Sequence, residues 1–438
     1  MTSHDFSITS LGKASIPSPV ALSKRNDDLI ANYVSDDELI VYDVQATPGQ
    51  PVVYTKQELI EKAGPREFIY FDPSKVRAGI ITCGGLCPGL NDVIRAIVMT
   101  LWHQYGVRSI AGIRFGYRGL LPQWGYETID LDHATVSEIH RQGGTILGSS
   151  RGGGEKTEEL VDSIERMNLS LFFTIGGDGT QRGACRIAEE IERRKLKTAV
   201  IGIPKTIDND LSFIQKSFGF ETAVGKAVEA VAGAHVEAHD AVNGIGMVKL
   251  MGRESGFIAA HTALGNNDVN YVLIPEVPFD LDGERGLLNH LKERLARRNH
   301  ALIVVAEGAG QEHLAATAQT DASGNKKLGD IGTFLKQRIT EYFKKEGLEI
   351  NLKYIDPSYI IRSTPANPND SIYCTRLGNN AAHAAMAGKT RALISLINNT
   401  FVHVPMDLAV SKRNRIDPES PLWRDVIQAT GQPALLKN

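Results

Sequence analysis

Features that would set this chain apart from ordinary globular proteins are scarce in its sequence. Cysteine occurs only four times among 438 residues, at scattered positions, which excludes a disulfide framework and favours reduced thiols. No run of about 18 apolar residues occurs, so we expect no segment that spans a membrane. The formal net charge is only −3, which gives no reason to expect nucleic acid or an anionic membrane as the main partner.

The two ends of the sequence favour the cytoplasm. The N-terminal stretch MTSHDFSITS has an early aspartate and lacks the apolar core of a secretory signal. The C-terminal stretch ALLKN differs from the peroxisomal tripeptide. We therefore expect a cytoplasmic protein.

Apolar material for a core is present, since hydrophobic residues make up 42% and charged residues 23% of the chain. Residues 1–75 are polar and irregular, apart from a strand-like piece at 39–42. From Arg77 onward, apolar runs of strand length alternate with amphipathic segments of helix length. The predicted strands are 78–83, 109–113, 169–175, 199–203, 246–250, 269–274, 301–306 and 392–397. The predicted helices are 91–104, 155–168, 182–194, 221–237, 284–298 and 333–345, and 315–327 is typical of a polar loop.

Fully apolar strands that alternate with helices indicate parallel sheets covered on both faces. This pattern predicts the α/β class, with doubly wound, Rossmann-like sheets. So many strands suit two such sheets better than one. At about 150 residues per domain, the length suggests two or three domains.

Glycine-rich segments follow two of the predicted strands, at the position where open α/β sheets bind ligands. Gly84 and Gly85 follow the first strand, and paired glycines let backbone N–H groups approach a phosphate. A plain glycine turn explains that pair equally well. The string GGDGT at 176–180 adds a carboxylate, Asp178, where Mg²⁺ would bridge phosphate oxygens. The alternative role of Asp178 is a helix cap.

The string PKTIDND at 204–210 follows another apolar strand and is dense in polar side chains. Asp208 and Asp210 can divide the work, because one can take a proton while the other orients it or faces a metal. Lys205 can neutralise phosphate charge. The structural alternative is an Asx-rich turn.

Two arginines and a glutamate also lie at strand ends. Arg253 follows one predicted strand, and Arg362 follows a segment at 354–361 that we expect to be extended. An arginine at such a position suits bidentate recognition of phosphate, although a surface ion pair would also explain each one. Glu307 follows a very apolar strand and suits the hydroxyls of a sugar, although a surface group that acts like a helix N-cap would explain it equally well.

Two further patterns point to no site. The string AGKT at 387–390 is like the end of a P-loop, but the earlier glycine that the P-loop requires is replaced by His383. His235 and His239 are four residues apart, but the intervening order differs from that of the H-E-x-x-H zinc motif.

Taken together, these motifs resemble the phosphofructokinase family. Six strings fall in that family's order: GGxxPGxN at 84–91, GGDGT at 176–180, PKTIDND at 204–210, MGR at 251–253, AEG at 306–308 and DPSYIIRS at 356–363. The resemblance runs from about residue 76 almost to the C-terminus. It is greatest to the branch with plant-like and trypanosome-like ATP-dependent enzymes.

The resemblance implies a role for each matching residue. Asp208 would accept the proton of the sugar C1 hydroxyl, and the other catalytic residues would be Lys205, Thr206, Asp210 and Arg253. Asp178 would be linked to Mg²⁺, and ATP would lie against Gly85, Arg151, Gly152, Gly176, Gly177, Asp178 and Gly179. Fructose 6-phosphate would contact Thr206, Ile207, Asp208, Met251, Gly252, Arg253, Glu307, Tyr359, Ile360, Ile361 and Arg362.

The resemblance also implies a domain plan with the active site between two domains. The nucleotide-binding domain would comprise 76–218 and 362–412, and the sugar-phosphate domain 219–361 and 413–438, after an N-terminal extension at 1–75. A homotetramer or homodimer is expected.

The chain departs from the bacterial pattern at several positions. Leu86 and Cys87 replace the usual Asp-Ala, and Tyr359 stands where a histidine is usual. Gly244 and Lys353 stand where bacterial tetramers place arginines that reach the sugar phosphate across a subunit interface.

The sequence contains one feature typical of enzymes that use ATP as the phosphoryl donor and one typical of enzymes that use pyrophosphate. In this family, a glycine at Gly179 leaves room for ATP, whereas Lys205 is frequent in enzymes that use pyrophosphate. A glycine and a lysine at these two positions also occur together in the ATP-using branch. A side chain in place of Gly179 would exclude ATP sterically, whereas an extra cation such as Lys205 is compatible with either donor. We therefore expect an ATP-dependent 6-phosphofructokinase. The alternatives are a pyrophosphate-dependent phosphofructokinase and a non-catalytic regulatory subunit that binds a sugar phosphate.

Overall fold

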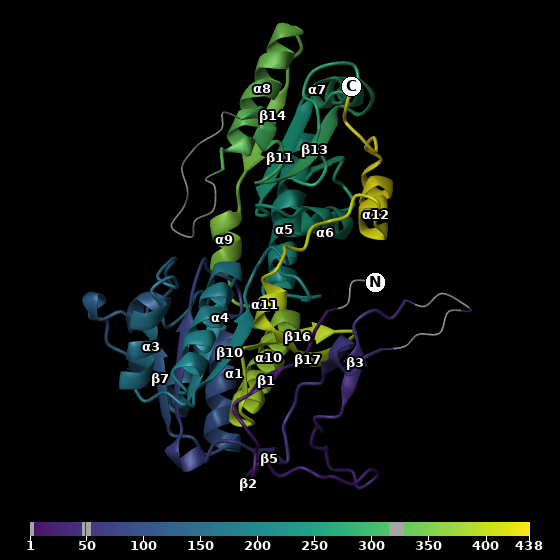
Figure 1. The fold of residues 1–438 in the computed structure, drawn as a ribbon. Coiled ribbons are helices and arrows are strands. Elements are labelled where there is room, and N and C mark those ends of the chain that lie inside the picture. The colour runs from purple at the N-terminus through teal and green to yellow at the C-terminus, as the bar shows by residue number, and fades with distance from the viewer. Residues whose placement is uncertain (1–3, 46–48, 50–53, 315–327) are drawn as a thin grey trace. The chain divides into compact units, whose positions relative to one another are not determined.

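The computed structural model describes residues 4–45, 49, 54–314 and 328–438. The chain divides into two compact units, whose elements are labelled in Figure 1. Unit 1 is Met1–Thr206, Leu211–Gly219 and Thr364–Arg413, and unit 2 is Ile207–Asp210, Phe220–Ser363 and Asn414–Asn438. The sequence-based boundaries fall after 218, 361 and 412, whereas the units divide after 219, 363 and 413, and 207–210 counts with unit 2.

Unit 1 is built on a seven-stranded sheet in the order β17-β16-β10-β9-β6-β7-β8. The strands from β16 to β7 are parallel, and β17 and β8 pair antiparallel at the two edges. The strands are β6 (Arg77–Thr82), β7 (Ser109–Ile113), β8 (Ile129–Asp130), β9 (Leu171–Gly176), β10 (Ala199–Pro204), β16 (Ala392–Ile397) and β17 (Thr400–Pro405).

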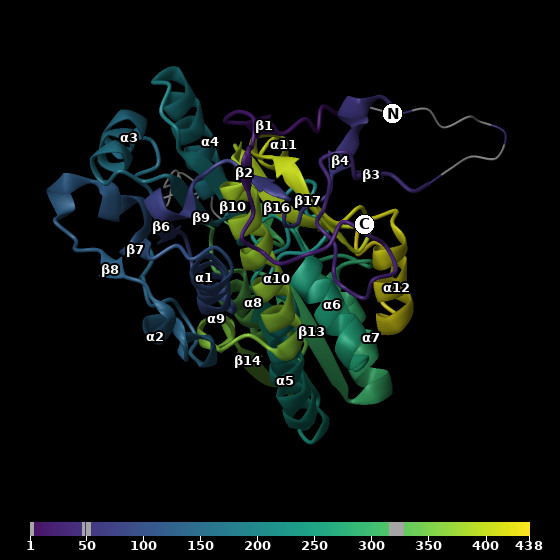
Figure 2. The same cartoon turned by 90° about the horizontal axis from the view of Figure 1, so that it is seen from below.

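Helices cover both faces of this sheet. Figure 2 shows α3 (Thr157–Arg166) and α4 (Asp178–Arg193) on one face and α1 (Leu90–Met99) and α10 (Pro368–Met386) side by side on the other. A π turn at Thr100–Gln104 extends α1. The short helices of unit 1 are α2 (His133–Val136), α11 (Met406–Ala409) and the 3₁₀ turns Lys56–Glu58, Pro73–Lys75, Gly116–Leu120, Pro122–Trp124 and Ile139–Arg141.

The N-terminal extension contributes short strands to unit 1. β1 (Thr9–Ser10) pairs antiparallel with β15 (Lys389–Thr390). β2 (Ile16–Pro17) pairs with β5 (Phe68–Ile69), and β3 (Leu39–Val41) pairs with β4 (Leu59–Glu61). The strand-like piece expected at 39–42 is therefore present, and it is one of several in a segment expected to be irregular.

Unit 2 contains a parallel four-stranded sheet in the order β12-β13-β11-β14. Its strands are β11 (Gly244–Leu250), β12 (Tyr271–Leu273), β13 (His300–Ala306) and β14 (Asn351–Ile355). Its helices are α5 (Phe220–His239), α6 (Phe257–Asn266), α7 (Leu287–Arg298), the 3₁₀ turn Gln311–His313, α8 (Ile331–Lys345), α9 (Ser358–Ser363) and α12 (Pro421–Thr430).

Alternate residues of each central strand of unit 2 face two different cores. Val248 of β11 packs with α5, α6 and α12, whereas Met247 packs with α7 and α8. This alternation follows from the two-residue period of a strand, and both faces are apolar because helices cover both. Parallel sheets with helices on both faces confirm the predicted α/β class.

The prediction of an extended segment at 354–361 is wrong. β14 ends at Ile355, and α9 begins three residues later, at Ser358. The carboxylate of Asp356 accepts a hydrogen bond from the N–H of Ser358 at 3.1 Å, which forms an Asx turn directly before the helix. The carbonyl of Pro357 accepts the first hydrogen bond of the helix, from the N–H of Ile361 at 2.9 Å.

Other predictions concern loops, membranes and thiols. The polar loop expected at 315–327 lies outside the described residues. None of the helices in the described part of the chain is long and apolar enough to cross a membrane. All four cysteines are buried, and none of them forms a disulfide bond in the described ranges.

Candidate active site

Three loops of unit 1 converge at the carboxyl ends of β6, β9 and β10, which are neighbours in the sheet. Lys205 joins all three. Its N–H donates to the carbonyl of Gly176 at 3.0 Å, and its Nζ donates to the carbonyl of Gly85 at 2.7 Å. Only 7% of Lys205 is exposed, so its charge lies within the loops rather than in solvent.

The glycines of the GGDGT loop are required for different reasons. A Cβ at Gly176 would lie 2.3 Å from Oγ1 of Thr180, and one at Gly177 would lie 3.1 Å from the carbonyl oxygen of Lys205. These two glycines therefore let the chain pack. A Cβ at Gly179 would meet nothing within 4 Å, so Gly179 borders open space.

Arg151 and Gly152 are brought to the first glycine loop from a distant part of the sequence. The N–H of Gly84 donates to the carbonyl of Ser150 at 2.9 Å, which ties the two loops together. A Cβ at Gly85 would lie 3.8 Å from Nη2 of Arg151. Gly152 has a φ of +76°, a left-handed conformation that favours glycine.

Asp178 is the first residue of α4 and is held by arginines that the sequence reading missed. Arg182 approaches it with two nitrogens, Nε at 3.1 Å from Oδ1 and Nη2 at 2.9 Å from Oδ2. Nη2 of Arg413 lies 3.8 Å from Oδ2. Arg182 follows Asp178 by four residues on one helix, a spacing that favours an ion pair and could have predicted this contact. Arg413 is distant in sequence, so no local pattern indicates its contact.

The residues present fit a magnesium ion that is shared with a substrate. In the described ranges, no group of three or more acidic, histidine or cysteine side chains could hold a metal ion. Mg²⁺ is usually bound by one or two carboxylates together with substrate phosphates, and Asp178 offers such a carboxylate. The side chain of Arg182 is 52% exposed, so water can solvate its guanidinium group if a metal ion takes its place beside Asp178.

In unit 2, Asp208 lies in an unusually acidic and desolvated place. Burial, followed by the charges of Asp210 and Glu307, raises the pKa of Asp208 to about 7. The charge of Arg362 and the backbone N–H of Arg253 oppose this rise. Oδ1 of Asp208 is buried and has no hydrogen-bond partner in the described residues. An acceptor of this kind is suited to take a proton.

The MGR and AEG strings lie side by side because β11 and β13 are adjacent and parallel. The N–H of Glu307 donates to the carbonyl of Leu250 at 2.9 Å, and the N–H of Gly308 donates to that of Gly252 at 3.0 Å. A Cβ at Gly308 would lie 1.9 Å from the carbonyl oxygen of Arg253, so only glycine fits there. Packing thus brings Arg253 and Glu307 together.

The predicted sugar-binding residues of α9 divide into two groups. Tyr359 and Ile360 are 81% and 70% exposed, and Nε of Arg362 lies 3.1 Å from Sδ of Met251. Ile361 and Met251, by contrast, are buried in the apolar core of unit 2. Their side chains are therefore unsuited to contact a sugar, and only their main chains can take part.

Comparisons with known proteins agree with these motifs. A match to the phosphofructokinase family covers residues 77–385, which is more than half of the chain. The chain belongs to the phosphofructokinase family. The ATP-dependent 6-phosphofructokinase of Borreliella burgdorferi is 55% identical, and the alignment covers 99% of this chain and 98% of that protein.

More distant members of the family are also similar. ATP-dependent 6-phosphofructokinase 1 of Arabidopsis thaliana is 47% identical, over 92% of this chain and 85% of that protein. The Trypanosoma cruzi ATP-dependent enzyme is 48% identical, over 85% of this chain and 76% of its own length. The resemblance to plant and trypanosome members is thus confirmed.

Solved structures agree on the fold. A pyrophosphate-dependent phosphofructokinase from Marinobacter aquaeolei has a TM-score of 0.65 at 20% identity, covering 81% of this chain and 91% of that one. Phosphofructokinase from Saccharomyces cerevisiae has a TM-score of 0.62 at 21% identity, covering 81% of this chain and 47% of that one. At such identities the likeness concerns the fold and not the phosphoryl donor.

Proposed function

We propose that this chain is an ATP-dependent 6-phosphofructokinase, which transfers the γ-phosphoryl group of ATP to the C1 hydroxyl of fructose 6-phosphate. The products are fructose 1,6-bisphosphate and ADP. The observation that carries this proposal is the carboxyl group of Asp208, whose pKa is raised to about 7 and whose Oδ1 lacks a hydrogen-bond partner in the described residues. A base with a pKa near the working pH is effective in proton transfer.

The remaining residues position the substrates and balance their charge, which supplies most of the catalysis in phosphoryl transfer. Asp208 accepts the proton of the hydroxyl as the new O–P bond forms. The negative charge of Asp210 disfavours the ionised form of Asp208 and so raises its affinity for that proton. Arg253 and Arg362 bind the sugar phosphate. When bound, Mg²⁺ neutralises donor phosphate charge, and Asp178 is the residue that would hold it.

The donor is ATP in this proposal because of Gly179. A Cβ there would enter open space, so packing within the protein does not require a glycine. A requirement for a bulky donor explains it instead. The similar proteins of Borreliella burgdorferi, Arabidopsis thaliana and Trypanosoma cruzi named above are all called ATP-dependent.

Two other functions are weaker candidates. Lys205 favours a pyrophosphate-dependent enzyme, but its Nζ donates to the carbonyl of Gly85, which gives it a part in joining the loops whichever donor is used. A non-catalytic regulatory subunit would have no need of Asp178, Asp208 and Arg253 together.

A single assay separates the three functions. The purified full chain is given fructose 6-phosphate with either Mg²⁺-ATP or Mg²⁺-pyrophosphate, and fructose 1,6-bisphosphate is measured. We expect product with ATP and at least 100-fold less with pyrophosphate. The reverse ratio would establish the second function, and sugar-phosphate binding without product would establish the third.

Assembly and location stay predictions. We expect a homotetramer or homodimer in the cytoplasm. Sedimentation of the purified chain with and without fructose 6-phosphate tests the assembly.

A further inference from the structure

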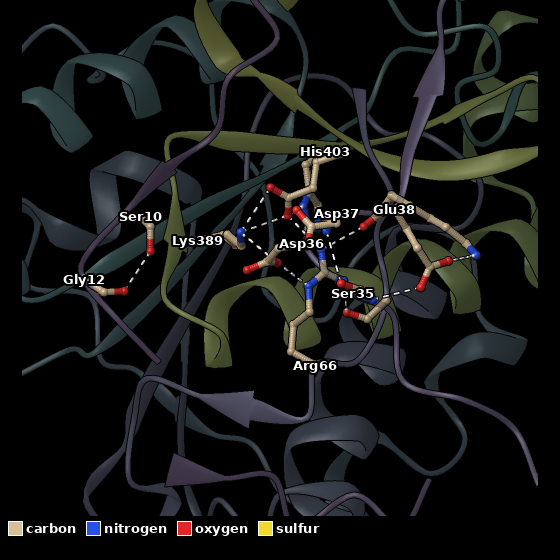
Figure 3. Close-up of polar contacts among 12 residues, drawn as sticks. Ser10, Gly12, Ser35, Asp36, Asp37, Glu38, Arg66, Lys389 and His403 are labelled. Atoms are coloured by element: carbon tan, nitrogen blue, oxygen red, sulfur yellow. Dashed lines mark hydrogen bonds and ion pairs between the residues drawn. The ribbon is translucent and has the colours of Figure 1, made fainter. Parts of the chain in front are cut away.

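The N-terminal extension is anchored on the rest of unit 1 by a partly buried cluster of charged side chains, part of which Figure 3 shows. Arg66, only 6% exposed, places Nε 2.7 Å from Oδ1 of Asp36 and Nη2 2.7 Å from Oε1 of Glu61. Nζ of Lys389 lies 3.0 Å and Nδ1 of His403 2.9 Å from the same Glu61 carboxylate. Because Lys389 and His403 come from β15 and β17, the cluster ties the extension to the body of unit 1.

From this anchor, the extension places aromatic side chains around a single ring. The ring of Phe213 lies 5.5 Å from that of Phe6, 5.2 Å from that of Tyr42 and 4.9 Å from that of His4, measured between centroids. The pairs with Phe6 and His4 are edge-to-face, at 83° and 77°. Distances and angles of this kind are favourable for aromatic pairs.

Phe213 itself has a backbone conformation that its surroundings must maintain. Its φ is +58°, a left-handed value that a bulky side chain rarely adopts. The residue is only 7% exposed, and its carbonyl accepts a hydrogen bond from Oγ of Ser395 at 3.0 Å. The rings of the extension therefore close over a strained residue rather than an ordinary surface position.

Phe213 follows the acidic residues Asp208 and Asp210 closely in the chain. Unit 1 holds both flanks of the segment 207–210. On one side, the carbonyl of Thr206 accepts a hydrogen bond from Oγ of Ser217. On the other side, Oγ of Ser212 donates to the carbonyl of Lys412 at 2.6 Å, next to Phe213.

We propose that the N-terminal extension acts as a brace for the segment 207–210. In this proposal Phe6 and Tyr42 fix Phe213, and Phe213 is a positioning residue for Asp208. This inference rests on the proposed function, because it gives the brace a purpose in proton transfer. None of the three aromatic residues touches the substrates in this proposal. Their effect passes along the four residues between Phe213 and Asp208.

The test removes the brace without changing a charge. The double variant Phe6→Ala/Tyr42→Ala deletes both rings and leaves the acidic segment intact. We expect kcat to fall by roughly 10-fold or more, since small misplacements of a catalytic group cost up to about 100-fold. The KM for ATP should change by less than about threefold, because the rings face Phe213 and not the glycine loops. Amide hydrogen exchange in 205–217 should become faster.

The matched control is Ile69→Ala. Ile69 is fully buried in the same extension, in β5, and is not among the described residues of the buried cluster that contains Phe6 and Phe213. This variant should lower the melting temperature but leave kcat and the exchange of 205–217 unchanged. The conservative variant Tyr42→Phe keeps the ring and should retain the wild-type values.

Three results would overturn the brace. They are a double variant with kcat within twofold of wild type, unchanged exchange in 205–217, or an equal loss of kcat in Ile69→Ala. Should the double variant not fold, Tyr42→Ala replaces it, because Tyr42 is already 38% exposed, and it should produce the same two changes in smaller measure. A wild-type chain without kinase activity would refute the proposed function alone, since the exchange measurement still decides the brace.

Discussion

Replacing Asp208 by asparagine tests the proposed proton acceptor most directly. The side chain keeps its shape but can no longer take a proton. General-base catalysis typically contributes about 10²–10⁴-fold, which is roughly 3–5 kcal/mol of the barrier. We expect kcat to fall by at least about 100-fold, while nucleotide binding persists because the glycine loops that would hold ATP are unchanged.

The structure also sets the pH dependence of the wild type. The ordinary pKa of 3.8 is raised to about 7, first by burial and then by Asp210 and Glu307. A difference of about 3 pH units corresponds to about 4 kcal/mol for ionising this carboxyl group. A base works only when deprotonated, so kcat/KM should rise with pH and level off above about pH 7. Asp210→Asn removes a neighbouring negative charge and should move this ascending limb to lower pH.

Stability should respond with the opposite sign. Between pH 3.8 and about 7, the folded state binds the Asp208 proton more tightly than the unfolded state does. Stability therefore falls as the pH rises through this window. Asp208→Asn removes that loss, so the variant should melt at a higher temperature than the wild type at pH 8 and at a similar one at pH 4.

The assay is a coupled measurement of fructose 1,6-bisphosphate from pH 5.5 to 9, and thermal melts are recorded at pH 4 and pH 8. An Asp208→Asn variant that keeps more than a tenth of the wild-type kcat would remove Asp208 from its role. A wild-type profile that is flat across this range, with an unshifted Asp210→Asn profile, would refute the argument from burial and neighbouring charge.

Three further predictions concern binding and stability. Arg362→Ala should raise the KM for fructose 6-phosphate by roughly 10- to 150-fold, the worth of a charge-assisted contact, and leave that for ATP unchanged; a larger effect on ATP would reverse the assignment. Gly179→Asp should reduce kcat/KM for ATP by about 10³-fold or more, with Gly233→Asp, another open helical position, as the inert control. Glu61→Gln should lower the melting temperature at pH 7, because His403 and the charges of Lys389 and Arg66 outweigh burial and hold the pKa of Glu61 at about 2. This stabilisation of the folded state, about 3 kcal/mol, is present above pH 4.5 and is lost as the pH falls to about 2. Equal melting temperatures of the variant and the wild type at pH 7 would contradict the prediction.

Local signals located most strands of the parallel sheets, but they did not predict the edge strands β8 and β17 or the helix α9. The runs at 109–113 and 392–397 coincide with β7 and β16, because a parallel strand covered on both faces is continuously apolar. The helix predicted at 182–194 begins earlier, at Asp178, because its first turn lies within the glycine string and has no amphipathic pattern. The segment expected to be extended at 354–361 instead forms α9 after an Asx turn at Asp356.

The sequence by itself determined the fold class and the family, together with the loops that carry glycines and carboxylates, since these depend on the order of residues along the chain. Only the tertiary structure decided which loops meet, because strand order is not chain order: β10, β9 and β6 are neighbours. It also showed that the side chain of Ile361 lies in the core, that Arg413 approaches Asp178 and that rings of the extension surround Phe213. Contacts between residues far apart in the chain depend on packing, which leaves no periodic pattern in a single sequence.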